Sequence, residues 1–126
     1  MDTDWAIRWL RGNKAIGRLL ADWHPDGLAV SIITLAELYE GVYAAKDRAS
    51  HQAGLDQFLQ GVTVLGVSKP IARLFAHHRV QLRRKNKLIG DLDLLIATTA
   101  LHHSLAVLTN NRKHFDRVQG LTVVSA

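Results

Sequence analysis

The order of apolar segments in this chain predicts an α/β fold with a mostly parallel sheet and helices on both sides. Short apolar segments alternate with amphipathic helical segments along the whole length. The expected strands are apolar throughout, which is typical of parallel strands buried on both faces. With 126 residues the chain has the length of one domain, which we place at residues 1–126.

Turn-forming residues separate the elements of the first half. Gly12 and Asn13 interrupt the apolar pattern of residues 4–20, so this region is expected to form two short helices. Proline and glycine predict a turn at residues 25–27. The other elements expected here are a strand at residues 28–31, helices at 34–46 and 50–59, and a strand at 62–65.

The second half opens with a long helix that begins at Ser68. Serine is a good helix cap, and Pro70 is tolerated in the first helical turn because its missing N–H would have no partner there. A further helix is expected from Asp91 through the apolar residues that follow it. Two apolar strands, at residues 105–108 and 121–124, complete the alternating pattern.

Composition excludes several function classes. The chain has no cysteine, so disulfides, thiolate zinc sites and cysteine nucleophiles are excluded, and a reducing compartment is favoured. The segment from Gly12 to Gly17 lacks the Gly-Lys-Ser/Thr ending of a phosphate loop. Sixteen Lys and Arg residues against eleven acids give a net charge of +5, which favours nucleic acid as a partner. No membrane span is expected, because the longest uncharged stretch contains histidine and asparagine.

Acidic residues stand at three of the expected junctions between a strand and the following helix. They are Asp2 and Asp4, then Glu37, then Asp91 and Asp93. A fourth junction, after the strand at 105–108, carries Thr109, Asn110 and Asn111. The carboxyl ends of parallel strands lie at one edge of a sheet, where binding sites of open α/β folds are found.

Each acid also has a purely structural interpretation. Glu37 and Thr34 match a capping box, Asp91 has the position of a helix cap, and Asp2 and Asp4 are suited to cap the first helix. Against this, carboxylates that converge at one edge repel one another unless a cation neutralises them. Mg²⁺ and Mn²⁺ prefer such oxygen ligands and promote phosphodiester cleavage, so a basic protein with this cluster is predicted to be a nuclease.

Four motifs resemble those of the PIN-domain ribonucleases. The first is Asp2-Thr3-Asp4, and the second spans residues 31–41 with its acid at Glu37. The third spans residues 89–97 with its acid at Asp93, and the last includes residues 108–111 and 120–123. Within that family the chain is most similar to the VapC toxins of toxin–antitoxin pairs.

The resemblance implies a three-layer α/β/α fold and an Mg²⁺-dependent endoribonuclease, with Mn²⁺ as a possible substitute. It also implies a homodimer in the prokaryotic cytoplasm, inhibited by a VapB-type antitoxin. The acidic core would be Asp2, Glu37 and Asp93, which are also the expected metal ligands. Secondary candidates are Asp91, Asp4, Thr109, Asn111 and Asp116.

Two departures from the family pattern affect these expectations. Asn111 stands where an acid is often found, and Asp116 would replace that charge only if the next turn brought it inward. Such domains also have an apolar strand before the first Asp, whereas here Met1 precedes Asp2 directly. We therefore expect a sheet that lacks its first strand and a destabilised domain. The alternative function is a catalytically impaired PIN-like domain that binds RNA or a protein partner.

The long helix that begins at Ser68 ends in a basic segment. Its residues are Arg79, Arg83, Arg84, Lys85 and Lys87. They are expected either to line a path for RNA through phosphate contacts or to form a solvated helix end that the helix dipole favours. A phospho-receiver domain is a third possibility for this fold class, but no Asp follows the strand at 62–65 to accept a phosphoryl group.

Overall fold

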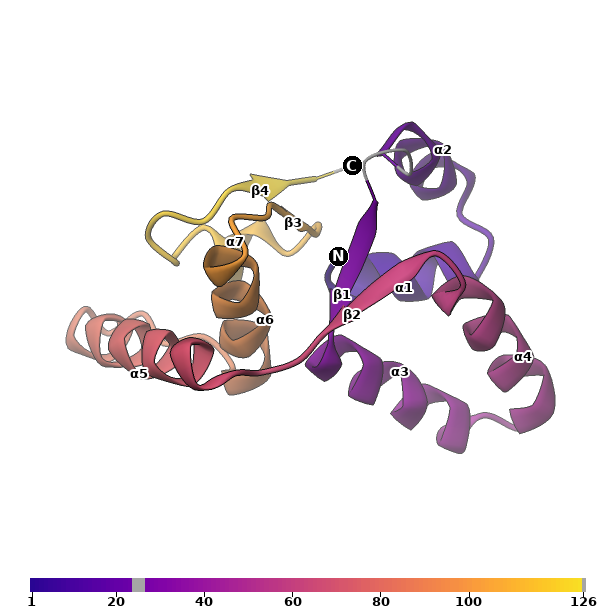
Figure 1. Cartoon of the computed structure of the whole chain (residues 1–126), viewed down its shortest axis with the longest axis horizontal. Helices are drawn as coiled ribbons and strands as arrows, with labels where there is room; N and C mark the ends of the chain where they lie inside the picture. The colour runs from indigo at the N-terminus through magenta and orange to yellow at the C-terminus, as the bar shows by residue number, and fades with distance from the viewer. Residues whose placement is uncertain (24–26, 126) are drawn as a thin grey trace.

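A computed structural model describes residues 1–23 and 27–125 of the chain. Its helices are α1 (Thr3–Leu10), α2 (Lys14–Trp23), α3 (Ile32–Ala44), α4 (Arg48–Leu59), α5 (Lys69–Arg84), α6 (Asp91–His102) and α7 (Arg112–Phe115). Its strands are β1 (Leu28–Ser31), β2 (Val62–Leu65), β3 (Val107–Leu108) and β4 (Val123–Val124). The alternating order of strands and helices confirms the predicted fold class (Figure 1).

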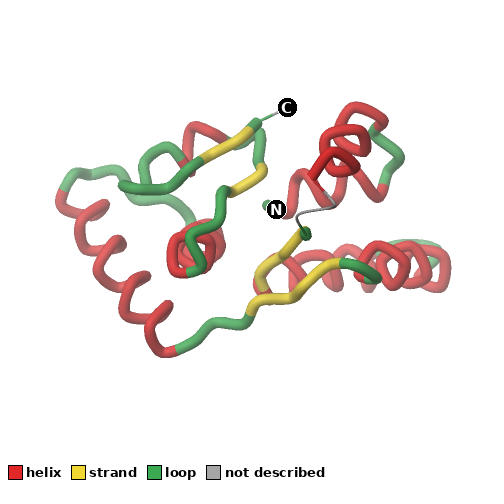
Figure 2. The backbone as a smooth tube through the Cα atoms, turned by 45° about the horizontal axis from the view of Figure 1, so that its top comes forward, coloured by secondary structure: helices red, strands yellow, loops and turns green. Residues whose placement is uncertain are grey.

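The strands form two parallel pairs rather than one continuous sheet. β1 pairs with β2, with Leu28 opposite Val62, and β3 pairs with β4, with Val107 opposite Val123. The N-terminus lies between the two pairs in both views (Figures 1 and 2). The first element that the structure describes is α1, which begins at Thr3 directly after its cap, Asp2. Among the described residues, no strand pairs with both β1 and β3.

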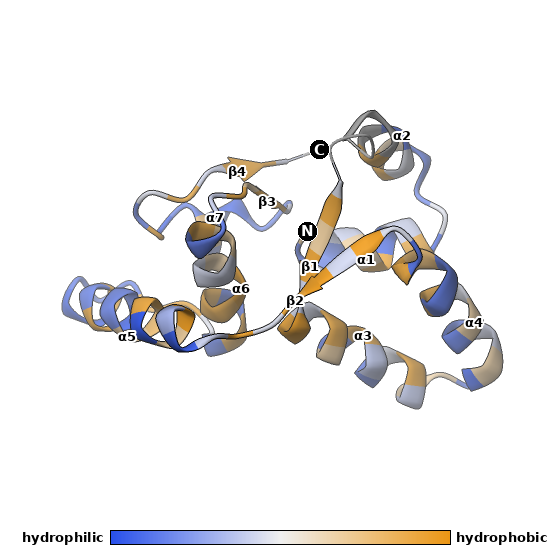
Figure 3. Cartoon of the chain, in the orientation of Figure 1, coloured by the Kyte–Doolittle hydropathy of each residue, from blue (hydrophilic) through white to orange (hydrophobic). Residues whose placement is uncertain are grey.

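Helices cover both faces of these strands. Leu108 of β3 packs with Trp5 and Ile16 from α1 and α2, whereas its neighbour Val107 packs with Ile96 and other residues of α6. Adjacent strand residues point to opposite faces, so α1 and α2 lie on one side of β3 and α6 lies on the other. The strands are accordingly among the most apolar parts of the ribbon (Figure 3).

A third apolar cluster attaches α3 and α4 to the first strand pair. Val30 of β1 packs with Leu38 and Val42 of α3 and with Leu55 and Phe58 of α4. All five side chains are at most 5% exposed. This cluster holds β1 in place, and with it the start of α3, where one of the predicted acids lies.

Helix caps account for the differences between expected and observed boundaries. Ser31, not Thr34, caps α3, since its hydroxyl accepts a hydrogen bond from the N–H of Thr34 at 3.0 Å, and the helix therefore begins at Ile32. The cap of α6 is Gly90, so the prediction that Asp91 serves as the cap was wrong. Ser68 caps α5 as predicted.

The short helix α7 was not expected from the sequence, because four residues are too few to show a helical period. The turn predicted at residues 25–27 lies outside the described residues except for Gly27. No helix among residues 1–23 and 27–125 is long and apolar enough to cross a membrane.

Candidate active site

Asp2 lies where the N-terminus meets the carboxyl end of β3. Its backbone N–H donates to the carbonyl of Leu108 at 2.9 Å, and its carboxylate accepts hydrogen bonds from the N–H of Thr3 at 2.7 Å and the hydroxyl of Thr109 at 2.8 Å. Asp2 is 5% exposed and Thr109 is fully buried. The carboxylate of the residue that precedes α1 and a hydroxyl at the end of β3 are thus joined inside the protein.

Asp4 lies beside the same hydroxyl. Its carboxylate accepts a hydrogen bond from the N–H of Asn110 at 3.2 Å and a longer one from the hydroxyl of Thr109 at 3.4 Å. Burial raises the pKa of Asp2 to about 7, the hydrogen bond from Thr109 opposes this rise, and the negative charge of Asp4 adds to it. The site therefore contains more negative charge than its own residues neutralise.

Glu37, on α3, is linked to Asp2 through the neighbouring residue Thr3. The hydroxyl of Thr3 donates to a carboxylate oxygen of Glu37 at 2.8 Å and lies 3.4 Å from the hydroxyl of Thr34. The capping box proposed for Glu37 and Thr34 is therefore not formed, since the Glu37 side chain is bonded to α1 instead. Because Thr3 directly follows Asp2, this hydrogen bond ties the acid of α3 to the first acid of the chain.

Asp93 is approached by a histidine that the sequence did not single out. His114 Nδ1 lies 3.4 Å from Asp93 Oδ2 and 3.1 Å from the side-chain nitrogen of Asn111. The N–H of Asn111 donates to the hydroxyl of Thr109 at 3.0 Å. His114 follows Asn111 by three residues, which brings the two side chains to the same side of α7. The three-residue spacing of Asn111 and His114 is visible in the sequence. It points to a contact between the two side chains only once a helix is known to begin after Asn111.

These contacts form one connected chain of side chains. It runs from Asp93 through His114, Asn111 and Thr109 to Asp2, while Thr3 and Glu37 continue it on the far side. The expected convergence is only partial, since no three His, Asp or Glu side chains among residues 1–23 and 27–125 lie close enough to hold a metal ion as they stand.

Two secondary candidates lie outside this network. Asp91 makes an exposed ion pair with Arg79 at 2.9 Å, and Asp116 makes another with Arg112 at 3.3 Å. The carboxylate of Asp116 is 52% exposed, so the turn after Asn111 does not bring it inward. Both acids are occupied by neighbouring cations at the surface.

The sequence was compared with the profiles of known protein families. The PIN domain family profile matches residues 1–121. The chain belongs to the PIN-domain family. Ribonuclease VapC2 of Rickettsia felis is 36% identical to this PIN domain over 94 residues, which are 75% of this chain and 70% of that protein. Ribonuclease VapC19 of Mycobacterium tuberculosis is 35% identical over 117 residues, 91% of this chain and 90% of that protein.

The structure of the chain also superposes closely on a solved structure. The crystal structure of VapBC2 from Rickettsia felis, bound to a DNA fragment from the promoter, matches this PIN domain with a TM-score of 0.94 at 28% identity. The match covers 99% of this chain and 96% of that chain. The similarity therefore extends over both strand pairs and all the helices around them.

The donor chemistry of this PIN domain suits a hard divalent cation. Asp2, Glu37 and Asp93 offer carboxylate oxygens, and the raised pKa of Asp2 marks a negative charge that a cation would stabilise. Mg²⁺ commonly uses one or two carboxylates and completes its coordination with water, so it does not require three side chains to converge. The residues present thus fit such an ion.

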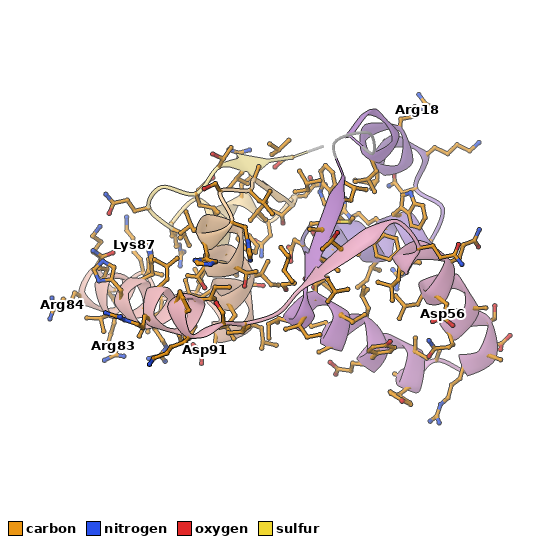
Figure 4. The ribbon with its side chains drawn as sticks, in the orientation of Figure 1. Arg18, Asp56, Arg83, Arg84, Lys87 and Asp91 are labelled. Carbon is orange, nitrogen blue, oxygen red and sulfur yellow. The ribbon has the colours of Figure 1, made fainter. Side chains whose placement is uncertain are left out.

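The predicted basic segment lies on the second half of α5 and the residues that follow it. Figure 4 shows Arg83, Arg84 and Lys87 projecting from the outer end of this helix, whereas Arg18 lies at the opposite end of the molecule. Lys85 is exposed next to them. Arg79 is the exception, because its ion pair with Asp91 neutralises it on the surface.

Proposed function

We propose that this PIN domain is a metal-dependent endoribonuclease of the VapC toxin type. The observation that carries the proposal is the buried carboxylate of Asp2, linked through Thr109, Asn111 and His114 to Asp93 and through Thr3 to Glu37. Relatives named ribonuclease VapC support the same activity over most of the chain. The expected cofactor is Mg²⁺, with Mn²⁺ as a substitute, and the expected compartment is the prokaryotic cytoplasm.

Asp2 and Asp93 would hold the ion, with Glu37 as a third ligand or as the group that orients the attacking water. An ion bound there supplies a Lewis acid for the phosphate and lowers the pKa of a bound water. Thr109 aims the carboxylate of Asp2 and keeps it from rotating, because its hydroxyl donates to one oxygen while the N–H of Thr3 donates to the other. Thr3 gives Glu37 a fixed position in the same way.

His114 has a distinct part in this arrangement. Its Nδ1 can donate to Asp93 only when that nitrogen carries a proton, and Asn111 must then present its side-chain oxygen rather than its nitrogen to the ring. In that tautomer the ring of His114 would orient the carboxylate of Asp93.

The test is RNA cleavage by pure protein with Mg²⁺, with EDTA, and by two matched variants. Asp93→Asn removes a proposed ligand, whereas Asp91→Asn changes an acid in the same helical turn that only pairs with Arg79. We expect EDTA and Asp93→Asn to abolish cleavage and Asp91→Asn to leave it intact. Cleavage that survives EDTA would disprove the metal mechanism, and a folded but inactive wild type would favour the binding-domain alternative.

We also propose a VapB-type antitoxin as the protein partner. The VapBC2 structure supports this, since it matches the fold over nearly the whole chain. A cleft of about 310 Å³ between α1, α3 and α4 is lined by apolar side chains such as Ile7, Leu38 and Leu55. Glu37 lines the same cleft, so an antitoxin segment bound there would lie against the acidic site. We further expect a homodimer, which light scattering of the free protein would reveal.

A further inference from the structure

His114 brings an imidazole nitrogen to a network that otherwise offers oxygen ligands. The side chain of His114 is 40% exposed, and that of Asp93 opposite it is 28% exposed, so ions from solvent can reach both. Neutral imidazole is a common metal ligand through either of its ring nitrogens. His114 therefore places a nitrogen donor beside Asp93, one of the carboxylates proposed to hold an ion.

The spacing between these two side chains leaves room for an ion. Nδ1 of His114 lies 3.4 Å from Oδ2 of Asp93. A hydrogen bond between a charged nitrogen donor and a carboxylate is usually about 2.7–2.9 Å long, so the pair is not closed into a short ion pair. Adjacent ligands of an octahedral ion with bonds of about 2.1 Å lie roughly 3.0 Å apart. A small rotation of either side chain would bring both atoms onto one ion.

The side chain of Asn111 meets the same ring nitrogen. Its amide nitrogen lies 3.1 Å from Nδ1 of His114, and an amide nitrogen can only donate. In this arrangement Nδ1 accepts, so it carries a lone pair and no proton, which is the form that binds a metal ion. An ion at Nδ1 would replace the amide hydrogen there. Rotation of the amide would then offer its oxygen, which is also a ligand for hard divalent ions.

The carboxylate of Asp93 forms no ion pair with Lys or Arg among residues 1–23 and 27–125, and its basic neighbour is His114. By contrast, Asp91 and Asp116 each pair with an arginine. A neutral imidazole does not balance a negative charge. The charge of Asp93 is thus left for a cation, at the place where a nitrogen donor is also present.

Asn111 also connects this place to Asp2. The backbone N–H of Asn111 donates to the hydroxyl of Thr109 at 3.0 Å, and that hydroxyl donates to the carboxylate of Asp2 at 2.8 Å. The residues around His114 therefore belong to the network that orients Asp2, the other carboxylate proposed to hold the ion.

We propose that His114 is a ligand, through Nδ1, of the divalent ion that Asp93 holds, and that it makes the site prefer Mn²⁺ to Mg²⁺. This inference rests on the proposed function, because it concerns the ion of the same site. Mg²⁺ is bound mainly by oxygen, whereas imidazole is a ligand of the first-row transition metals. Mn²⁺ accepts carboxylate and water ligands as Mg²⁺ does, but it also belongs to the transition series. One nitrogen among oxygen donors therefore favours Mn²⁺.

The test measures metal binding to the whole protein without RNA. Pulsed EPR of bound Mn²⁺ detects a directly coordinated nitrogen, and titrations with Mn²⁺ and Mg²⁺ give the two dissociation constants. We expect nitrogen coupling in the wild type and tighter binding of Mn²⁺. His114→Gln should remove the coupling and weaken Mn²⁺ binding roughly tenfold or more. The control His102→Gln, which changes an exposed histidine at the other end of α6, should alter neither.

His114→Glu distinguishes a ligand from a merely structural side chain. Glutamate offers an oxygen in place of the nitrogen, so this variant should lack the coupling and bind Mg²⁺ more tightly than the wild type does. Thermal melting in EDTA checks that each variant folds, and the coupling in the wild type decides the assignment if a variant does not.

The outcomes separate this inference from the proposed function. Mn²⁺ bound without nitrogen coupling, or bound equally by the wild type and a folded His114→Gln variant, would overturn the inference and leave metal-dependent cleavage standing. Nitrogen coupling that is lost in His114→Gln, in a protein that cleaves no RNA, would support the inference and refute the proposed function. A wild type that binds neither ion would overturn both.

Discussion

Asp2→Asn is expected to stabilise the metal-free protein at neutral pH while removing a proposed metal ligand. Asparagine has the size of aspartate, and its side-chain oxygen can still accept from the N–H of Thr3. Its amide can donate to the hydroxyl of Thr109, which is then free to direct its own proton toward Asp4. The substitution thus removes a buried charge and leaves the surrounding hydrogen bonds satisfied.

The size of the effect follows from the pKa of Asp2. Burial raises this pKa from 3.8 to about 7, and about three pKa units at 1.36 kcal/mol each amount to roughly 4 kcal/mol. Since the folded pKa is the higher one, the stabilisation that protonated Asp2 provides is fully present below pH 3.8. It is lost as the pH rises from 3.8 through the folded pKa of about 7, because the unfolded chain releases the proton of Asp2 over this range while the folded protein retains it. The asparagine variant has no such loss.

The assay is urea unfolding of both proteins in EDTA from pH 4 to pH 8. The terminal ammonium of Met1 titrates in the opposite sense, because burial lowers its pKa from 8.0 to about 6 and its contribution to stability is lost as the pH falls through 6. Met1 is mostly protonated in both states below pH 6, so the window from pH 4 to 6 isolates Asp2. There the stability difference between the proteins should grow by about 1.4 kcal/mol per pH unit.

Asp116→Asn is the matched control for this experiment. Its carboxylate is exposed and paired with Arg112, so its removal should leave the pH dependence of unfolding close to that of the wild type. A stability difference between wild type and Asp2→Asn that stays constant from pH 4 to pH 7 would refute the reasoning. It would mean that Asp2 is hydrated or neutralised in the folded protein.

Two further predictions concern RNA binding and the core. The double variant Arg83→Glu/Arg84→Glu should weaken RNA binding and flatten its salt dependence by about 0.7 in the logarithmic slope for each lost phosphate contact. Arg18→Glu, at the opposite end of the molecule, should leave the slope unchanged, and equal slopes for all three proteins would exclude the outer end of α5 as an RNA contact. Leu94→Ala should cost about 2–5 kcal/mol of unfolding free energy in urea, because this side chain is fully buried in the cluster around α6. Leu88→Ala, at a side chain 43% exposed, should cost much less, and similar losses for both would contradict the assigned core.

The acid–hydroxyl contacts of the site show why its chemistry and its stability are linked. Asp2 is held by Thr109, 107 residues away in the chain, and Glu37 by Thr3, 34 residues away. Each contact joins an acid to a hydroxyl on a different element, so the site exists only when α1, α3 and β3 are in place together.

The sequence by itself determined the class of fold and the region of the site. Local apolar patterns predicted β1 and β2 at their observed residues, and the acids at strand-to-helix junctions predicted an acidic edge. These features depend on neighbours in the chain, which a single sequence displays.

Only the tertiary structure decided which side chains meet. The hydroxyl of Thr3 bonds Glu37 where a local capping box was expected, and His114 reaches Asp93 from a helix too short to have a readable period. Asp91 and Asp116 form exposed ion pairs with nearby arginines and make no contact with the network around Asp2. Such choices depend on the relative positions of elements far apart in sequence, and those positions are set by the packing of the whole core, which no local pattern encodes.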